Sequence, residues 1–264
     1  MAAAVLALAA VSWLAMAWLH GHGFADWPAS HPLQAAAGHG AHTHGAHVHG
    51  TAGWNVPPAM LWLAGWVVMV LAMMLPTALP FLRELSRLLG GRSHSGRLVA
   101  AGAAGFVLAW MVAGAALLTA GTVLNGIVGR LDWVGSHPAL PAGAAAILAG
   151  AYQFTGLKRA CLAACRSPAG LLMARWRADA PLRAATSSGL HYGLVCIGCC
   201  WALMTLGLLV GALALPVMVL TAVVMAAERM LPWVRPLVPL QAALCAAVGL
   251  LLLSGILPPA AGWP

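Results

Sequence analysis

The sequence predicts an all-α fold: a polytopic transmembrane helical bundle of seven spans, or six if the first is cleaved, with a cytoplasmic N-terminus. Of the 264 residues, 62% are hydrophobic and 7% are charged. In soluble domains, hydrophobic residues average roughly 45–50% and charged residues roughly 25%. Thirteen basic and five acidic residues are too few to cover the surface of a soluble globule of this size. The composition therefore excludes a soluble enzyme, a nucleic-acid-binding domain and a disordered protein as descriptions of the whole chain.

Seven apolar segments approach the length that a helix needs to cross a bilayer, about 20 residues. Lipid admits only helices or closed barrels, and these long apolar runs lack the alternation of barrel strands. The sixth segment is the shortest and follows the fifth through a tight turn. The expected spans are residues 2–19, 59–82, 98–124, 140–157, 189–210, 213–228 and 236–257.

The basic residues predict the orientation of these spans. The net charge of +8 is interpreted as topology and not as affinity for nucleic acid. With seven spans, 12 of the 13 Lys and Arg residues lie on one side, in segments 83–97, 158–187 and 229–235. Cytoplasmic loops are rich in Lys and Arg. These segments are therefore expected inside, with the N-terminus, and the C-terminus outside.

Three parts of the chain follow from this topology. Residues 1–19 are a first transmembrane helix or a signal-like segment, and a retained helix is favoured because no basic region precedes it. Residues 20–57 form an external His-rich loop, and residues 58–264 form a six-span membrane domain.

The external loop is a candidate metal-capture segment. It holds eight of the eleven histidines, and its core repeats a Gly-Ala-His pattern. Neutral imidazole binds zinc, copper and nickel, and small residues between the histidines let the chain wrap an ion. The alternative is a polar, low-complexity linker. The candidate ligands of the repeat are His39, His42, His44, His47 and His49.

Two cysteine clusters form a second candidate site. Cys161 and Cys165 are four residues apart, as are Cys196 and Cys200, so each pair shares one helical face. The predicted topology puts both clusters in the cytoplasmic half, where they can meet. Thiolates and thioethers favour Cu(I), although cysteine and methionine also serve as packing residues. The further candidate ligands are Cys199, His191, Met73 and Met74.

Several stretches resemble the bacterial family of predicted metal-binding integral membrane proteins, a domain family of unknown function. The similarity covers roughly residues 58–232 and includes the ending of the sixth span at Glu228 and Pro232. Gly156 departs from the proline expected in that family. The resemblance implies a bacterial cytoplasmic (inner) membrane protein. The matching stretches are 72–80, 149–168 and 189–204.

These observations favour a membrane protein that binds, delivers or transports a transition metal. Copper(I) is favoured, and zinc, nickel and cobalt stay open. The expected partners are the lipid bilayer, the metal ion and a soluble metal donor or acceptor protein, with no nucleic acid. One alternative is a membrane thiol-disulfide oxidoreductase that uses Cys196 and Cys199 with Cys161 or Cys165 as their partner. Lys158 or Arg159 could lower the pKa of a thiol there. Another is a non-catalytic assembly subunit. No catalytic residues are assigned, because phosphate loops, nucleophile elbows and paired carboxylates are absent from the sequence.

Overall fold

The described part of the chain is helical throughout, which confirms the all-α class. It contains ten α-helices, one 3-10 turn and no strand. The computed structural model describes residues 2–21, 58–90, 94–128, 130, 139–177, 179–209, 214–231 and 237–256.

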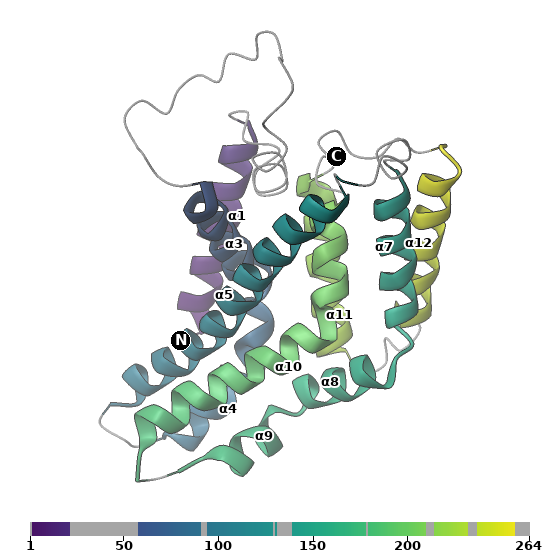
Figure 1. The fold of residues 1–264 in the computed structure, drawn as a ribbon. Coiled ribbons are helices and arrows are strands. Elements are labelled where there is room, and N and C mark those ends of the chain that lie inside the picture. The colour runs from purple at the N-terminus through teal and green to yellow at the C-terminus, as the bar shows by residue number, and fades with distance from the viewer. Residues whose placement is uncertain are drawn as a thin grey trace, which may run out of the picture.

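The first two described helices pair, and the second is broken by a proline. Helix α1 (Ala2–Gly21) lies beside α3 (Pro58–Met73) (Figure 1). Pro76 has no N–H, so the carbonyl of Ala72 loses its usual helical donor. The indole Nε1 of Trp13 in α1 donates to that carbonyl instead, at 3.2 Å. The Ala72 carbonyl, which has no donor within its own helix, therefore accepts a hydrogen bond that links α3 to α1.

Beyond this break the chain turns by 50°. The 3-10 turn η1 (Pro76–Ala78) leads into α4 (Leu79–Leu88). The segment expected as one continuous span over 59–82 is therefore two helices joined at the proline.

The two longest helices cross at small residues. Helices α5 (Ser95–Val128) and α10 (Pro181–Leu209) run side by side (Figure 1). A Cβ atom on Gly189 would overlap with the backbone oxygen of Gly102, and one on Gly105 would overlap with that of Thr186. The glycines therefore permit contact between the backbones of the two helices.

The first and last helices after α5 in the described part of the chain form a third pair. Helices α7 (Ala139–Tyr152) and α12 (Leu237–Leu253) pack against each other (Figure 1). The chain turns after Tyr152, and the Thr155 side chain accepts a hydrogen bond from the Lys158 amide at 3.3 Å. This N-cap starts α8 (Gly156–Arg166), which is followed by α9 (Pro168–Arg175). Helix α11 is Ala214–Met230.

Fewer than seven helices reach spanning length among the described residues. Two helices are long and apolar enough to cross a membrane, over Ser95–Leu124 and Pro181–Met204. The two helices joined at Pro76 would form a third span if they are counted as one. Helix α7 ends at Tyr152, not at residue 157, because of the capped turn. Its 14 residues cover about 21 Å, short of the roughly 30 Å hydrocarbon core. The seven-span count is therefore not supported by this structure, and the side of the N-terminus stays a prediction.

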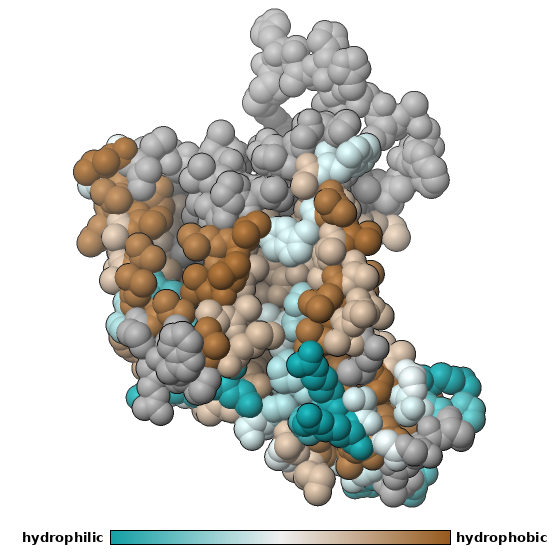
Figure 2. All heavy atoms as spheres, turned by 180° about the vertical axis from the view of Figure 1, so that it is seen from behind, coloured by the Kyte–Doolittle hydropathy of each residue, from teal (hydrophilic) through white to brown (hydrophobic). Residues whose placement is uncertain are grey.

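Large apolar side chains nevertheless lie on the outside of the protein. Figure 2 shows them gathered over much of one face, with hydrophilic residues toward its lower end. Leu14 is 70% exposed, Leu148 69% and Leu220 62%. Soluble monomers rarely expose apolar patches this extensively, and such surface usually marks an interaction with protein or membrane.

The glycine crossing of α5 and α10 gives a first prediction. We expect Gly189→Ala to lower the free energy of unfolding by about 1–3 kcal/mol, because the backbone of Gly102 cannot yield to the new methyl group. Gly126→Ala, also in α5 and with nothing within 4 Å of the added Cβ, is the control. It should stabilise the helix by about 0.5–1 kcal/mol. Thermal unfolding followed by circular dichroism measures both, and equal melting temperatures would contradict the close crossing.

Candidate metal centre

Two cysteine sulfurs meet between α8 and α10. The Sγ atoms of Cys165 and Cys199 are 3.8 Å apart, and both residues are buried. Cys161 packs against α10 one turn earlier, where a Cβ on Gly198 would lie 2.6 Å from its Sγ atom. The four-residue spacing of Cys161 and Cys165 therefore turns both side chains toward α10, and the glycine leaves room for the first of them.

A second sulfur contact lies beside the proline break. The Sγ atom of Cys200 is 4.0 Å from the Sδ atom of Met74, the residue next to the end of α3. The thiols of Cys199 and Cys200 both donate to the carbonyl of Cys196 one turn earlier, at 3.1 and 3.0 Å. These bonds hold the two side chains on the same side of α10.

The buried cation Arg229 joins the two sulfur contacts. Its Nη2 donates to the Sγ atoms of Cys199 and Cys200, at 3.1 and 3.3 Å. Its Nη1 donates to Thr77 Oγ1 at 2.5 Å, and that hydroxyl donates to the Met74 carbonyl at 2.7 Å. Arg229 was missed by sequence reasoning, although its place directly after Glu228 at the end of an expected span was a signal.

The cations expected near the thiols, Lys158 and Arg159, are elsewhere. Arg159 is exposed. Lys158 is buried, donates to Gln153 Oε1 and pairs with the Glu228 carboxylate at 3.2 Å. The Glu228 carboxylate thus binds Lys158, and its backbone oxygen accepts a hydrogen bond from Arg166 Nε at 2.9 Å.

The thiols of α8 are protonated at neutral pH. The hydrogen bond with Cys199, together with burial, raises the pKa of the Cys165 thiol. Burial and the nearby Cys199 raise the pKa of the Cys161 thiol. Because metals bind thiolates, an ion bound here must displace protons.

The predicted ligands do not all converge. Among the described residues, no group of three or more His, Cys, Asp or Glu side chains is arranged to hold a metal ion. Of the predicted cysteine ligands, Cys165 and Cys199 bring the two clusters together, with their Sγ atoms 3.8 Å apart. His191 is half-buried and lies about 140° around α10 from Cys196. Met73 is buried beside Met74, and Cys245 lies on α12, against Gly150 of α7.

The histidines of the predicted capture loop lie outside the described residues. They are His39, His42, His44, His47 and His49.

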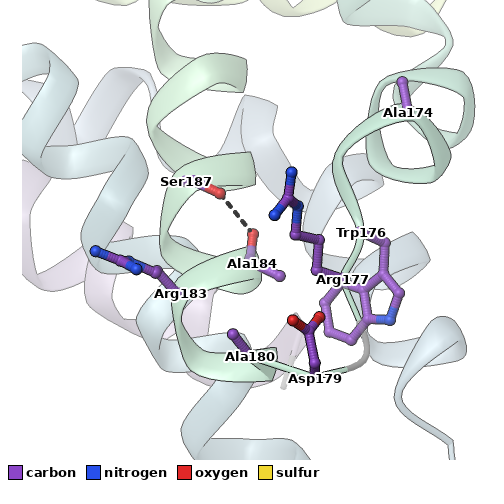
Figure 3. A pocket seen from close by; sticks show the side chains of 8 residues that line it. All are labelled: Ala174, Trp176, Arg177, Asp179, Ala180, Arg183, Ala184 and Ser187. Atoms are coloured by element: carbon purple, nitrogen blue, oxygen red, sulfur yellow. Dashed lines mark hydrogen bonds between the residues drawn. The ribbon is translucent and has the colours of Figure 1, made fainter.

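A surface hollow of about 750 Å³ lies away from the sulfurs, between α9 and the start of α10. Figure 3 shows the side chains around it, which include Trp176, Arg177 and Asp179. Cysteine, methionine and histidine are absent from its lining. The hollow is therefore separate from the sulfur contacts.

The family model PpoB2, described as a copper chaperone, matches residues 63–252. The chain belongs to this copper chaperone family. No curated protein matches the chain, and no solved structure does. The matched region contains Met74, Cys165, Cys199, Cys200 and Arg229, but not the His-rich loop. Membership of the copper chaperone family indicates copper handling, in agreement with the resemblance to metal-binding proteins.

The buried pair of Lys158 and Glu228 gives a second prediction. Glu228→Gln should cost about 3–5 kcal/mol of stability, because it leaves the ammonium group of Lys158 buried without a counter-charge. Adding Lys158→Met should restore part of that loss.

Glu84→Gln is the matched control, since it removes a carboxylate from the exposed pair with Arg87. It should cost no more than about 1 kcal/mol. Thermal unfolding compares the four proteins, and an equal effect at both glutamates would contradict the buried pairing.

Proposed function

We propose that this chain is a membrane-embedded copper-handling protein that binds Cu(I) as cargo between α8, α10 and the proline break after α3. Its ligands are Cys165 and Cys199, with Cys200 and Met74 next to them. The observation that carries the proposal is the 3.8 Å separation of the Cys165 and Cys199 sulfurs. Membership of the copper chaperone family supports the choice of metal.

The donor set suits a soft, monovalent ion. Thiolates and thioethers select Cu(I). Metal–sulfur bonds are about 2.3 Å long, so two sulfurs that share an ion lie within about 4.6 Å of each other. The Cys165–Cys199 separation of 3.8 Å and the Cys200–Met74 separation of 4.0 Å both meet this requirement.

The proposal that the protein is embedded in a membrane rests on the length of its apolar helices and on its exposed apolar surface. The long apolar helices α5 and α10 and the exposed apolar faces of Figure 2 support embedding in the bacterial cytoplasmic membrane. In the proposed topology of seven spans the N-terminus and the sulfur contacts are on the cytoplasmic side. Residues 20–57 are then outside, where their histidines capture the metal before delivery or transport.

The Cys165–Cys199 contact also favours one alternative function. Two free thiols at this distance could form a disulfide, as a thiol oxidoreductase requires. The sequence suggested Cys196 and Cys199 with Cys161 or Cys165 as their partner, and the Cys199 thiol contacts Cys165. Trapping of thiols in cells distinguishes the two functions, because cysteines that bind Cu(I) stay reduced whereas those of an oxidoreductase alternate with a disulfide.

Elemental analysis of purified protein tests the proposed copper site. We expect copper in the wild-type protein purified in detergent under reducing conditions. Exchanging both Cys165 and Cys199 for serine should lower the copper content at least about tenfold, because both shared thiolates are removed.

Cys245→Ser is the control, since Cys245 is buried in α12 away from these sulfurs. It should keep the wild-type copper content. Equal copper in the double variant and the control would refute the site.

The His-rich loop yields a separate prediction. A synthetic peptide of residues 38–50 should bind a divalent ion with a dissociation constant of about 1 µM or below. Binding should weaken below about pH 6, where imidazoles become protonated. Calorimetry with copper, nickel and zinc measures this, and the absence of binding for all three would return the loop to the role of a linker.

A further inference from the structure

We infer that Arg229 determines the metal selectivity of the sulfur site, by favouring a monovalent ion over a divalent one. The inference rests on the proposed function, since it concerns the same site. Arg229 is not a ligand. Its fixed positive charge adds to the charges of the bound ion and of the thiolates, and so changes the net charge of the buried site.

The guanidinium group is in direct contact with the sulfurs. Nη2 lies 3.1 Å from Cys199 Sγ and 3.3 Å from Cys200 Sγ, and the residue is 8% exposed. An arginine side chain stays charged at every physiological pH. The site therefore contains one permanent positive charge before any metal binds.

This charge has no carboxylate partner in the described part of the chain. The two salt bridges there are Arg87 with Glu84 and Lys158 with Glu228. Glu228, the neighbour of Arg229 in sequence, is thus already neutralised by Lys158. The sulfurs and the Thr77 hydroxyl are the groups that solvate the guanidinium.

The balance of charge then discriminates between metals. Two cysteines that bind an ion do so as thiolates, which together carry a charge of −2. With Cu(I) and Arg229 the site has a net charge of zero. With Zn(II) the net charge is +1, and an uncompensated charge in a buried site is costly. Two thiolates are the relevant number, because no group of three or more His, Cys, Asp or Glu side chains in the described part of the chain is arranged to hold an ion.

Arg229→Gln tests the inference, because glutamine keeps amide donors for the sulfurs but has no charge. Arg229→Lys is the matched control that keeps the charge. Chromophoric chelators specific for Cu(I) and for Zn(II) give the two dissociation constants for each purified protein. The ratio of the zinc constant to the copper constant should fall at least about tenfold in Arg229→Gln and stay near the wild-type value in Arg229→Lys.

A second pair of variants leaves Arg229 in place. Thr77→Asp puts a carboxylate on the residue that accepts from Nη1 and cancels the charge, whereas Thr77→Asn supplies a neutral acceptor. The ratio of the zinc constant to the copper constant should fall in Thr77→Asp and stay near the wild-type value in Thr77→Asn. This pair decides the question if Arg229→Gln does not fold, which thermal unfolding reports.

The outcomes separate the two proposals. Wild-type protein that binds copper, with an unchanged ratio in Arg229→Gln and Thr77→Asp, overturns the role of Arg229 and leaves the copper site standing. Wild-type protein that binds neither metal overturns both.

Discussion

A buried guanidinium group is the interaction on which the rest of the site depends. Arg229 extends from α11 to two thiols of α10 and to the hydroxyl of Thr77 in the turn after the proline break. A charge removed from water must keep its hydrogen-bond partners, since losing one partner costs several kcal/mol. One side chain therefore links α11, α10 and the turn after the proline break. The sulfurs that it contacts belong to the candidate ligands.

The helices around the site are held by two kinds of contact. Helices α5 and α10 meet backbone to backbone at glycines, a contact that a single methyl group would disrupt. Helices α8 and α11 are joined by polar bonds, from Lys158 to the Glu228 carboxylate and from Arg166 to the Glu228 carbonyl. Cys199 thus lies on a helix fixed by close packing, whereas Cys165 lies on a helix fixed by charge.

Local patterns in the sequence predicted the helices and the cysteine faces. Hydrophobic runs indicate helices because lipid and core packing both demand internal hydrogen bonds. The four-residue spacing of Cys161 and Cys165 placed both on the face that meets α10. The end of α7 at Tyr152 was not predicted, because a capping threonine overrides a continuing apolar run.

Contacts between distant residues could not be found in the same way. Met74 and Cys200 are 126 residues apart, and Arg229 is 152 residues from Thr77. Their meeting depends on the 50° turn at the proline, whose size the sequence does not specify. The positive charge near the thiols was expected from the residues closest in sequence, Lys158 and Arg159. The fold supplies it from another helix, while Lys158 is engaged by Glu228.

At the proposed copper site, the unequal exposure of the cysteines would govern how fast the ion exchanges. Five of the six are buried, and Cys161 is half-exposed at the edge of the contact between α8 and α10. An ion shared by Cys165 and Cys199 is out of reach of a bulky chelator or a cellular thiol such as glutathione until these helices separate. The opening of the protein would then limit how fast outside ligands reach an ion bound there. Cys161 is the thiol from which a partner protein could take the ion by stepwise ligand exchange, without release to water.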